Sequence, residues 1–302
     1  MNSLIGIIAG GFSSLQTAVN ARLGSAFGSS YRSSLVSFSL GALFLTISFL
    51  LTGGSLVITD HQLATIPWWA YIGGFTGAIC LTLNIVLFNY IGSTQTAILP
   101  VVGQLVTSAL IDQFGWFRMA TIKLTFGKVI GLCLLFLGAC LIVFKPQEQF
   151  APTSKNKRQI WWQILAILSG SLVAIQTATN GQLGHWLGSP IEASGIVFWT
   201  GAIVLLVIVI IQNRIQDLPK VQYAPWWSYL GGILGALNVA LGAWLVTVLG
   251  AGLTTALQLV GIMVVGLLID QFGMLGAERR KATRLQLLGL LVLFIGAILV
   301  EI

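Results

Sequence analysis

The chain has 302 residues, of which 56% are hydrophobic and only 8% charged, and its formal net charge is +7. A soluble domain carries roughly a quarter charged residues, so this chain lacks the polar surface that a water-soluble fold needs. The composition therefore predicts an integral membrane protein. The positive charge does not indicate nucleic-acid binding, because the basic residues fall in short segments between apolar stretches.

Ten stretches of the chain are apolar enough, at about 20 residues each, to cross the hydrocarbon core of a bilayer. They lack the alternating pattern of barrel strands, and a spanning segment must satisfy its own backbone hydrogen bonds. We therefore predict an all-α polytopic membrane protein. The first span is expected to be a permanent helix, since no basic residue precedes its apolar run. In chain order the predicted helices are 4–20, 34–51, 68–88, 94–111, 124–143, 160–179, 194–211, 226–249, 253–269 and 285–300.

Several sequence phrases occur twice, and they divide the chain into two copies of five helices. QTAVNARLG at 16–24 returns as QTATNGQLG at 176–184, and PWWAYIGGFTGA at 67–78 returns as PWWSYLGGILGA at 225–236. The phrase LIDQFG ends the fourth helix of each copy, at 110–115 and at 268–273. We predict a first repeat over 1–144, a polar linker over 145–159 and a second repeat over 160–302.

An odd number of helices per copy makes the second copy enter the membrane from the opposite side. Such inverted repeats are typical of secondary transporters, whose solute site lies where the repeats meet. All Lys and Arg residues except Arg118, Lys123 and Lys128 fall on the side of the linker. Because basic loops favour the cytoplasm, we predict that both termini face the periplasm.

These paired motifs resemble the drug/metabolite transporter superfamily, and within it the YdcZ-type inner-membrane exporters in a form with two fused halves. The resemblance covers nearly the whole chain, and it implies a bacterial inner-membrane carrier for small solutes. The small multidrug-resistance relatives place a glutamate within their first helix, whereas this chain has Gln16 and Gln176 there. That departure argues against proton-coupled export of hydrophobic cations.

Two pairs of amides recur on the first helix of each repeat. Gln16 and Asn20 are four residues apart, as are Gln176 and Asn180, so each pair shares one face of a helix. These amides either bond neighbouring helices or line a cavity at the membrane midplane. We favour the cavity, because the repeat symmetry would bring both faces to one axis.

Further amides and two tryptophans complete the predicted solute site. The glutamines lie on the fourth helices, where lining a cavity and pairing with a neighbouring helix are equal alternatives. Aromatic walls with a few fixed polar groups suit a small organic solute, although burial at a helix interface is the alternative that we favour for either tryptophan. The further predicted substrate-binding residues are Gln104, Gln258, Asn84, Asn238, Trp199 and Trp244.

Asp112 and Asp270 end the fourth helix of each repeat, and the inversion predicts that they lie at opposite membrane faces. They are candidates for gating or for coupling to an ion, since carboxylates within a membrane are functional candidates. The alternative that we favour is a bond to backbone amides of the following Gln-Phe-Gly turn. Glu192 stands just before the seventh helix, where a carboxylate ordinarily compensates the helix dipole.

The sequence favours a carrier over the alternatives of a membrane enzyme, a channel or a lipid head-group translocase. An enzyme would need acid, base or metal ligands gathered at a wet face, and the two histidines, His61 and His185, give little support for one. We expect no cofactor and no metal. The expected partners are membrane lipid, a neutral, zwitterionic or weakly cationic solute, and a coupling proton or ion. The protein is expected to be a monomer or a homodimer.

Overall fold

The computed structural model describes residues 1–55, 65–143, 157–215, 222–277, 279 and 281–302, and no strand is assigned in them. Short 3₁₀ helices, η1 (Trp68–Ile72), η2 (Trp116–Arg118), η3 (Trp226–Leu230) and η4 (Met274–Gly276), precede or follow the longer helices. The α-helices in the described residues are α1 (Asn2–Phe27), α2 (Ser30–Leu51), α4 (Gly73–Phe114), α5 (Phe126–Val143), α6 (Lys157–Leu187), α7 (Pro190–Ile215), α8 (Gly231–Leu249), α9 (Ala251–Phe272) and α10 (Arg284–Glu301).

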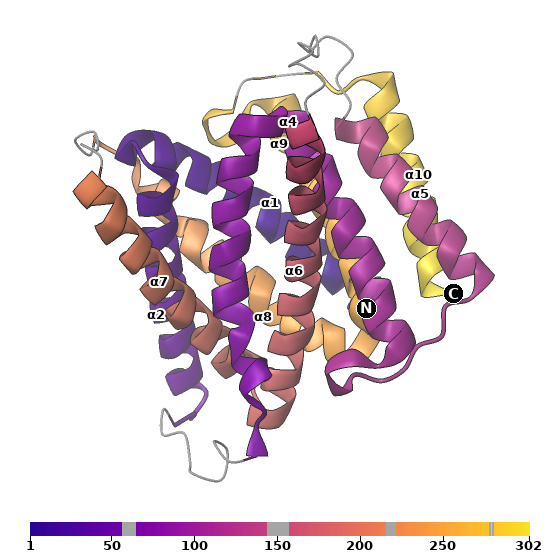
Figure 1. The fold of residues 1–302 in the computed structure, drawn as a ribbon, viewed down its shortest axis with the longest axis horizontal. Helices are drawn as coiled ribbons and strands as arrows, with labels where there is room; N and C mark the ends of the chain where they lie inside the picture. The colour runs from indigo at the N-terminus through magenta and orange to yellow at the C-terminus, as the bar shows by residue number, and fades with distance from the viewer. Residues whose placement is uncertain (56–64, 144–156, 216–221, 278, 280) are drawn as a thin grey trace.

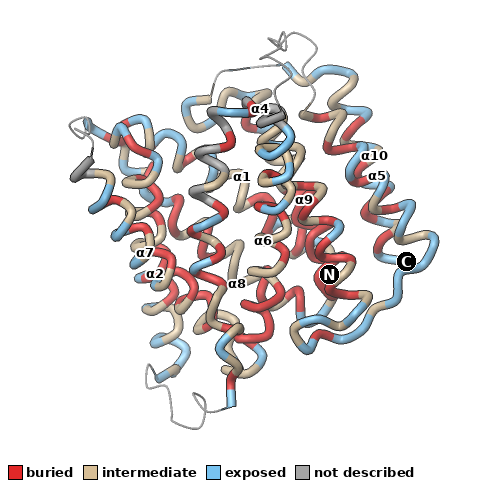
Figure 2. The backbone as a smooth tube through the Cα atoms, in the orientation of Figure 1, coloured by how far each residue is buried: buried red, intermediate tan, exposed pale blue. Residues whose placement is uncertain are grey.

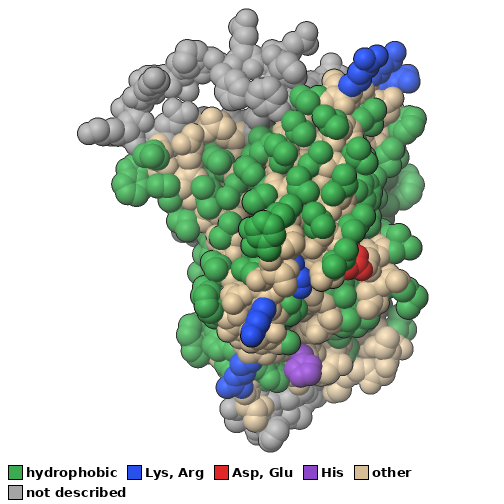
Figure 3. Space-filling model, turned by 90° about the vertical axis from the view of Figure 1, so that its right-hand side faces the viewer, with side chains coloured by type: hydrophobic (Ala, Val, Ile, Leu, Met, Phe, Trp, Pro, Cys, Tyr) green, Lys and Arg blue, Asp and Glu red, His purple; other side chains and the backbone are tan. Residues whose placement is uncertain are grey.

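Within the described ranges, nine helical stretches are long and apolar enough to cross a membrane. They coincide with nine of the ten predicted spans, and the remaining one, 68–88, falls at the beginning of α4. Figure 3 shows hydrophobic side chains over most of one flank of the molecule, with Lys and Arg gathered at its upper end and in its lower part. The prediction of an all-α polytopic membrane protein is therefore confirmed.

The prediction of separate helices at 68–88 and 94–111 needs a correction, because α4 has no assigned break between Gly73 and Phe114. A straight helix of its 42 residues would be about 63 Å long, about twice the thickness of the hydrocarbon core. Instead α4 doubles back along α6. The Cys80 thiol donates a hydrogen bond to the carbonyl of Ser169 (3.2 Å), while the Ser171 hydroxyl donates one to the carbonyl of Gly103 (3.4 Å).

Figure 1 shows these two parts of α4 rising and descending beside α6. We call the part that begins at Gly73 the first limb and the part that ends at Phe114 the second limb. Each limb supplies one of the two predicted spans, so the count of crossings is preserved.

The two halves of the chain run in opposite directions. Both termini lie on one face of the bundle, where the Ser3 hydroxyl donates a hydrogen bond to a Glu301 carboxylate oxygen (2.7 Å). We call this face the terminus side, and the opposite face, where α5 ends and α6 begins, the linker side (Figure 1). α1 starts on the terminus side whereas its counterpart α6 starts on the linker side, as inverted repeats require.

The repeats interlock through their first and fourth helices. A Cβ atom on Gly10 of α1 would collide with the backbone of α9 at Gln258, and one on Gly261 would collide with α1. The equivalent crossing joins α6 to the second limb of α4, where Gly170 and Gly103 are equally crowded. Figure 2 shows buried residues concentrated in the middle of the bundle, around α1, α6, α8 and α9. Glycine at these crossings lets the helix backbones touch.

Candidate solute site and gates

A cavity of about 220 Å³ lies between α1, α4, α6, α8 and α9, near the middle of the spans. Both repeats contribute to its wall, and none of its lining residues is charged. Its polar lining consists mainly of amides, which are Gln104, Gln176, Asn180, Asn238 and Gln258. Five of the ten predicted substrate-binding residues are thus brought together around one space.

Hydrogen bonds orient part of this amide group. The Gln258 Nε2 donates to Asn238 Oδ1 (3.3 Å), and the Asn180 Nδ2 donates to the Ser194 hydroxyl (3.3 Å). That hydroxyl uses its own proton in a bond to the carbonyl of Pro190 (2.7 Å), so it must accept from Asn180. The orientation of the Asn180 amide is fixed in this way, and its buried Oδ1 has no hydrogen-bond partner among the described residues.

Gln16 and Asn20 are not among the residues that line this cavity, so the expectation that four equivalent amides share it is not met in this conformation. They pack instead on α8, where a Cβ atom on Gly235 would collide with the Gln16 amide and one on Gly231 with the Asn20 amide. The equivalent contact of Gln176 is looser, because a Cβ atom on Gly77 would lie 3.0 Å from its Nε2.

The predicted tryptophans do not line the cavity either. Trp199 is 42% exposed on α7, where its Nε1 donates a hydrogen bond to the Thr46 hydroxyl of α2 (3.0 Å). It borders a separate groove of about 260 Å³, which Glu192 also lines. Trp244 is partly buried on α8. The side chain of Asn84 lies outside the described residues, so its predicted role is not placed.

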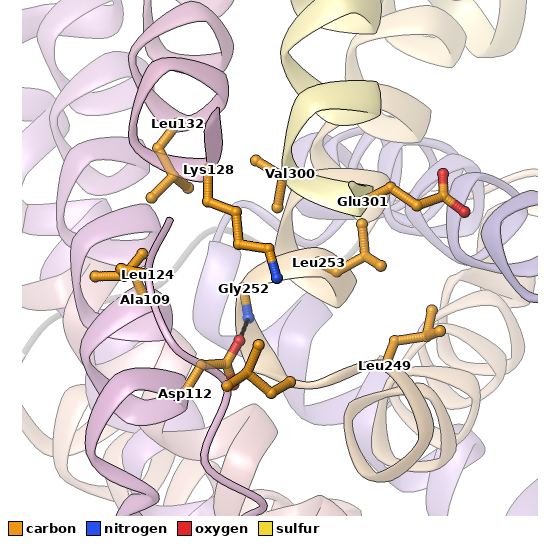
Figure 4. A pocket seen from close by; sticks show the side chains of 11 residues that line it. Ala109, Asp112, Leu124, Lys128, Leu132, Leu249, Gly252, Leu253, Val300 and Glu301 are labelled. Carbon is orange, nitrogen blue, oxygen red and sulfur yellow. Dashed lines mark hydrogen bonds between the residues drawn. The ribbon is translucent and has the colours of Figure 1, made fainter. Parts of the chain in front are cut away.

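Asp112 joins the two repeats on the terminus side. The residue is 6% exposed, and its carboxylate accepts hydrogen bonds from the backbone amides of Ala251 (2.6 Å) and Gly252 (2.7 Å). These amides begin α9, and Figure 4 shows Lys128 extending from α5 towards the same place while Glu301 points away. Asp112 therefore binds backbone amides of the second repeat. The expectation that it binds the Gln-Phe-Gly turn directly after it was wrong.

Both hydrogen bonds to Asp112 depend on the geometry of the chain between α8 and α9. Gly250 adopts a φ of +86°, which interrupts the helical path. The first amides of α9 consequently have no carbonyl acceptor within the helix, and their partial positive charge favours a carboxylate.

Aromatic rings of η1, η2 and α6 pack together near the terminus side. The ring of Trp69 lies 5.3 Å from that of Trp186 and 5.4 Å from that of Phe117. Gln182, further along α6 than the cavity residues, donates a hydrogen bond to the sulfur of Met119 (2.9 Å), and Met119 is itself buried. The loop that contains η2 thereby covers the end of the bundle next to Asp112.

The linker side has a cavity of its own among the described residues. Asp270 lies at the other end of α9 and lines a cavity of about 460 Å³ together with Ser14, Thr17 and Gln286. This linker-side cavity shares Ile262 with the central one. No hydrogen bond joins the Asp270 carboxylate to any described residue, in contrast to Asp112.

Sequence reasoning did not single out Lys128 or Gln286, although each borders the cavity beside its aspartate. They occupy equivalent positions in the two repeats, near the start of the fifth helix of each. Aligning the whole repeats, and not only their most obvious phrases, would have shown that a lysine in one copy replaces a glutamine in the other.

An all-helical bundle of inverted repeats with a cavity where the repeats meet defines a protein of the membrane-transporter class. The family described as "Putative inner membrane exporter, YdcZ" matches residues 1–141 and 161–299. The chain belongs to this family and is a multi-pass inner-membrane protein.

Among solved structures, one crystal structure superposes with a TM-score of 0.70 over 99% of this chain and 94% of its own. It is 10% identical in sequence, so the likeness concerns the fold alone. None of the curated proteins matches the chain.

Proposed function

We propose that the chain is a secondary transporter that exports a small neutral, zwitterionic or weakly cationic metabolite by alternating access. The observation that carries this proposal is the cavity of uncharged amides supplied by both repeats. Each amide both donates and accepts hydrogen bonds, so the site suits a polar solute without the cost of a buried charge. No described hydrogen bond occupies the amides of Gln104 or Gln176.

The size of the cavity supports a small solute. Its volume of about 220 Å³ is below the roughly 300 to 1,000 Å³ of sites for drug-sized ligands. A strongly anionic solute is disfavoured, because no cationic side chain lines the wall.

The difference between the two sides supports a carrier over a channel. The central cavity adjoins the linker-side cavity at Ile262, whereas on the terminus side Asp112 binds the first amides of α9 and the ring of Trp69 packs against that of Trp186. Access from one side at a time is what alternating access requires.

The direct test is a thermal-shift screen of the purified protein against a metabolite library. A solute present at 100 times its dissociation constant should stabilise the folded state by about 2.7 kcal/mol. The compound found should then undergo counterflow exchange in proteoliposomes. If it binds but moves without saturation or exchange, the channel is favoured and the carrier proposal fails.

A lipid head-group translocase is the second candidate, favoured by the groove between α2 and α7. This groove is mostly apolar, and the exposed Trp199 and the carboxylate of Glu192 line it. If this candidate holds, proteoliposomes should accelerate the exchange of a labelled head-group lipid between leaflets, and Trp199→Ala should slow that exchange. Unchanged exchange relative to protein-free liposomes removes this candidate.

We predict that both termini face the periplasm, since basic residues concentrate on the linker side. A cysteine added at either terminus of the chain should react with a membrane-impermeant maleimide in intact spheroplasts. A cysteine in the 145–159 linker should react only after permeabilisation. The reverse pattern would invert the proposed orientation.

A further inference from the structure

The helices α2 and α7 are equivalent in the two repeats, and they cross each other. The sequence GSSYRSSLVSFSLGA at 28–42 aligns with GSPIEASGIVFWTGA at 188–202. At the crossing, the ring of Phe38 stacks on that of its counterpart Phe198, with 4.9 Å between the centroids. The groove of about 260 Å³ between these helices lies on the terminus side of the crossing, where α2 ends and α7 begins.

The wall that α7 gives to this groove is not repeated in α2. Glu192, Gly195 and Trp199 line the groove, and their spacing places them on one face of the helix. The residues at the equivalent positions of the first repeat are Arg32, Leu35 and Ser39. Alternating access between inverted repeats uses features that both halves possess. A wall that only one half possesses, with the charge reversed in the other, indicates a separate task.

The deep part of the groove is apolar in its effect, because its polar groups are paired with one another. The indole Nε1 of Trp199 donates a hydrogen bond to the Thr46 hydroxyl (3.0 Å), and this hydroxyl donates its own proton to the carbonyl of Ala42 (2.8 Å). Both donors are therefore used. Trp199 is 42% exposed, so its ring faces the surroundings of the bundle, beside Leu45 and Phe49.

The carboxylate of Glu192 is the one charged group among the described residues that line the groove. It lies in the first turn of α7 and is partly buried. Trp199 follows seven residues later, about 10 Å further along the helix. The partial positive charge at the start of α7 offsets only part of the negative charge. A carboxylate beside the hydrocarbon core is costly without a cation, and no basic side chain is among these lining residues.

We propose that this groove binds an amine-bearing phospholipid, phosphatidylethanolamine, from the leaflet on the terminus side. Its ammonium group lies against Glu192, and one acyl chain lies along α7 over Trp199. A lipid fits because the groove offers a single charged end and an apolar remainder open to the surroundings of the bundle. The inference goes beyond the proposed export of a polar solute. It also differs from a translocase, because binding within one leaflet needs no passage beyond the crossing of Phe38 and Phe198.

The test measures lipid binding to the purified, delipidated protein by native mass spectrometry. It compares phosphatidylethanolamine with phosphatidylcholine of identical acyl chains. The ammonium of the first lipid donates hydrogen bonds to a carboxylate, whereas the quaternary nitrogen of the second has no proton to donate. The wild type should bind phosphatidylethanolamine at least about tenfold more tightly, as a hydrogen bond to a charged group provides.

Two carboxamide substitutions locate the source of this preference. Glu192→Gln should bring the dissociation constants of the two lipids within about twofold of each other, because the charge is lost while the shape is kept. Glu301→Gln is the matched control, since it removes an exposed carboxylate on the same side that does not line the groove. It should leave the preference unchanged. Equal binding of the two lipids by the wild type, or an unchanged preference in Glu192→Gln, would overturn the proposal.

The acyl chain is tested separately. Gly195→Leu introduces the leucine that the first repeat has at this position, and the added Cβ would meet only the Cβ of Leu45 at 3.8 Å. The variant should keep its melting temperature but bind both lipids at least about fivefold more weakly, because its side chain occupies apolar surface that the acyl chain would cover. Glycerophosphoethanolamine, which has the head group without acyl chains, should not displace the lipid at tenfold excess. Displacement by this compound, or unchanged lipid binding by Gly195→Leu, would show that no acyl chain occupies the groove. These measurements contain no metabolite, so they stand or fall apart from the export proposal.

Discussion

Replacing Gln176 by leucine should weaken solute binding about 5- to 150-fold, equivalent to about 1 to 3 kcal/mol, because a polar group of the bound solute loses its partner. Gln176 lines the central cavity, and its side chain makes no hydrogen bond to a described residue that the substitution would break. Thermal stability without the solute should therefore change little. The measurement is the dissociation constant of the metabolite from the thermal-shift screen, determined by calorimetry on the wild type and the variant.

The equivalent substitution in the first repeat is the matched control. Gln16→Leu changes the same residue in the same phrase, but Gln16 packs against Gly235 and does not line the cavity. It should lower the melting temperature and leave the dissociation constant within about twofold of the wild-type value, since no bond to solute is lost. If the two variants weaken binding equally, both amide pairs contact the solute at once and the placement of Gln16 outside the site is wrong.

The number of helices and their division into two repeats could be predicted from local sequence patterns. Ten apolar stretches and phrases such as PWWxY and LIDQFG, each present twice, are local patterns with local physical causes. The interlocking of first and fourth helices is less visible. Glycines at 10, 170, 103 and 261 mark close approach, but nothing in their spacing says which helix approaches.

The unequal roles of equivalent residues were beyond sequence reasoning. A carrier with inverted repeats must be asymmetric in any one conformation, because one side is closed while the other is open. Gln16 and Gln176 have nearly the same neighbours in sequence, yet only Gln176 lines the cavity. Asp112 likewise finds its partners at Ala251 and Gly252 in the other repeat, which no local pattern near Asp112 indicates.

The glycines of the third helices acquire a second role from this arrangement. Gly73 and Gly77 are four residues apart, as are Gly231 and Gly235, a spacing that lets helices pack closely. In the structure Gly231 and Gly235 receive Asn20 and Gln16, so the amides of one repeat lie on the glycines of the other. A carrier that exchanges its two conformations by inversion would reverse which amide pair is tightly covered. The amide motif and the glycine motif would then have to be repeated together, because each amide pair packs on the glycines of the other repeat.

Placing a single methyl group at the helix crossings should have the largest effect on stability. Gly261→Ala puts a Cβ atom against the backbone carbonyl of Ile7 on α1, and Gly103→Ala does the same against Ile167 on α6. A backbone atom cannot rotate away, so the helices must separate along their crossing. We expect each variant to lose at least about 2 to 3 kcal/mol of unfolding free energy, as overpacked interiors do.

The control for these crossings is Gly195→Ala on α7, where the nearest atom to an added Cβ is the Cβ of Leu45 at 3.8 Å. That is ordinary contact, and alanine also favours the helix, so Gly195→Ala should melt at the wild-type temperature or above it. Reversible unfolding of purified protein in mixed micelles gives the comparison. Because the two crossings are equivalent under the repeat symmetry, Gly261→Ala and Gly103→Ala should be destabilised to a similar degree. A wild-type unfolding free energy for either variant would mean that the first and fourth helices do not touch as the structure has them.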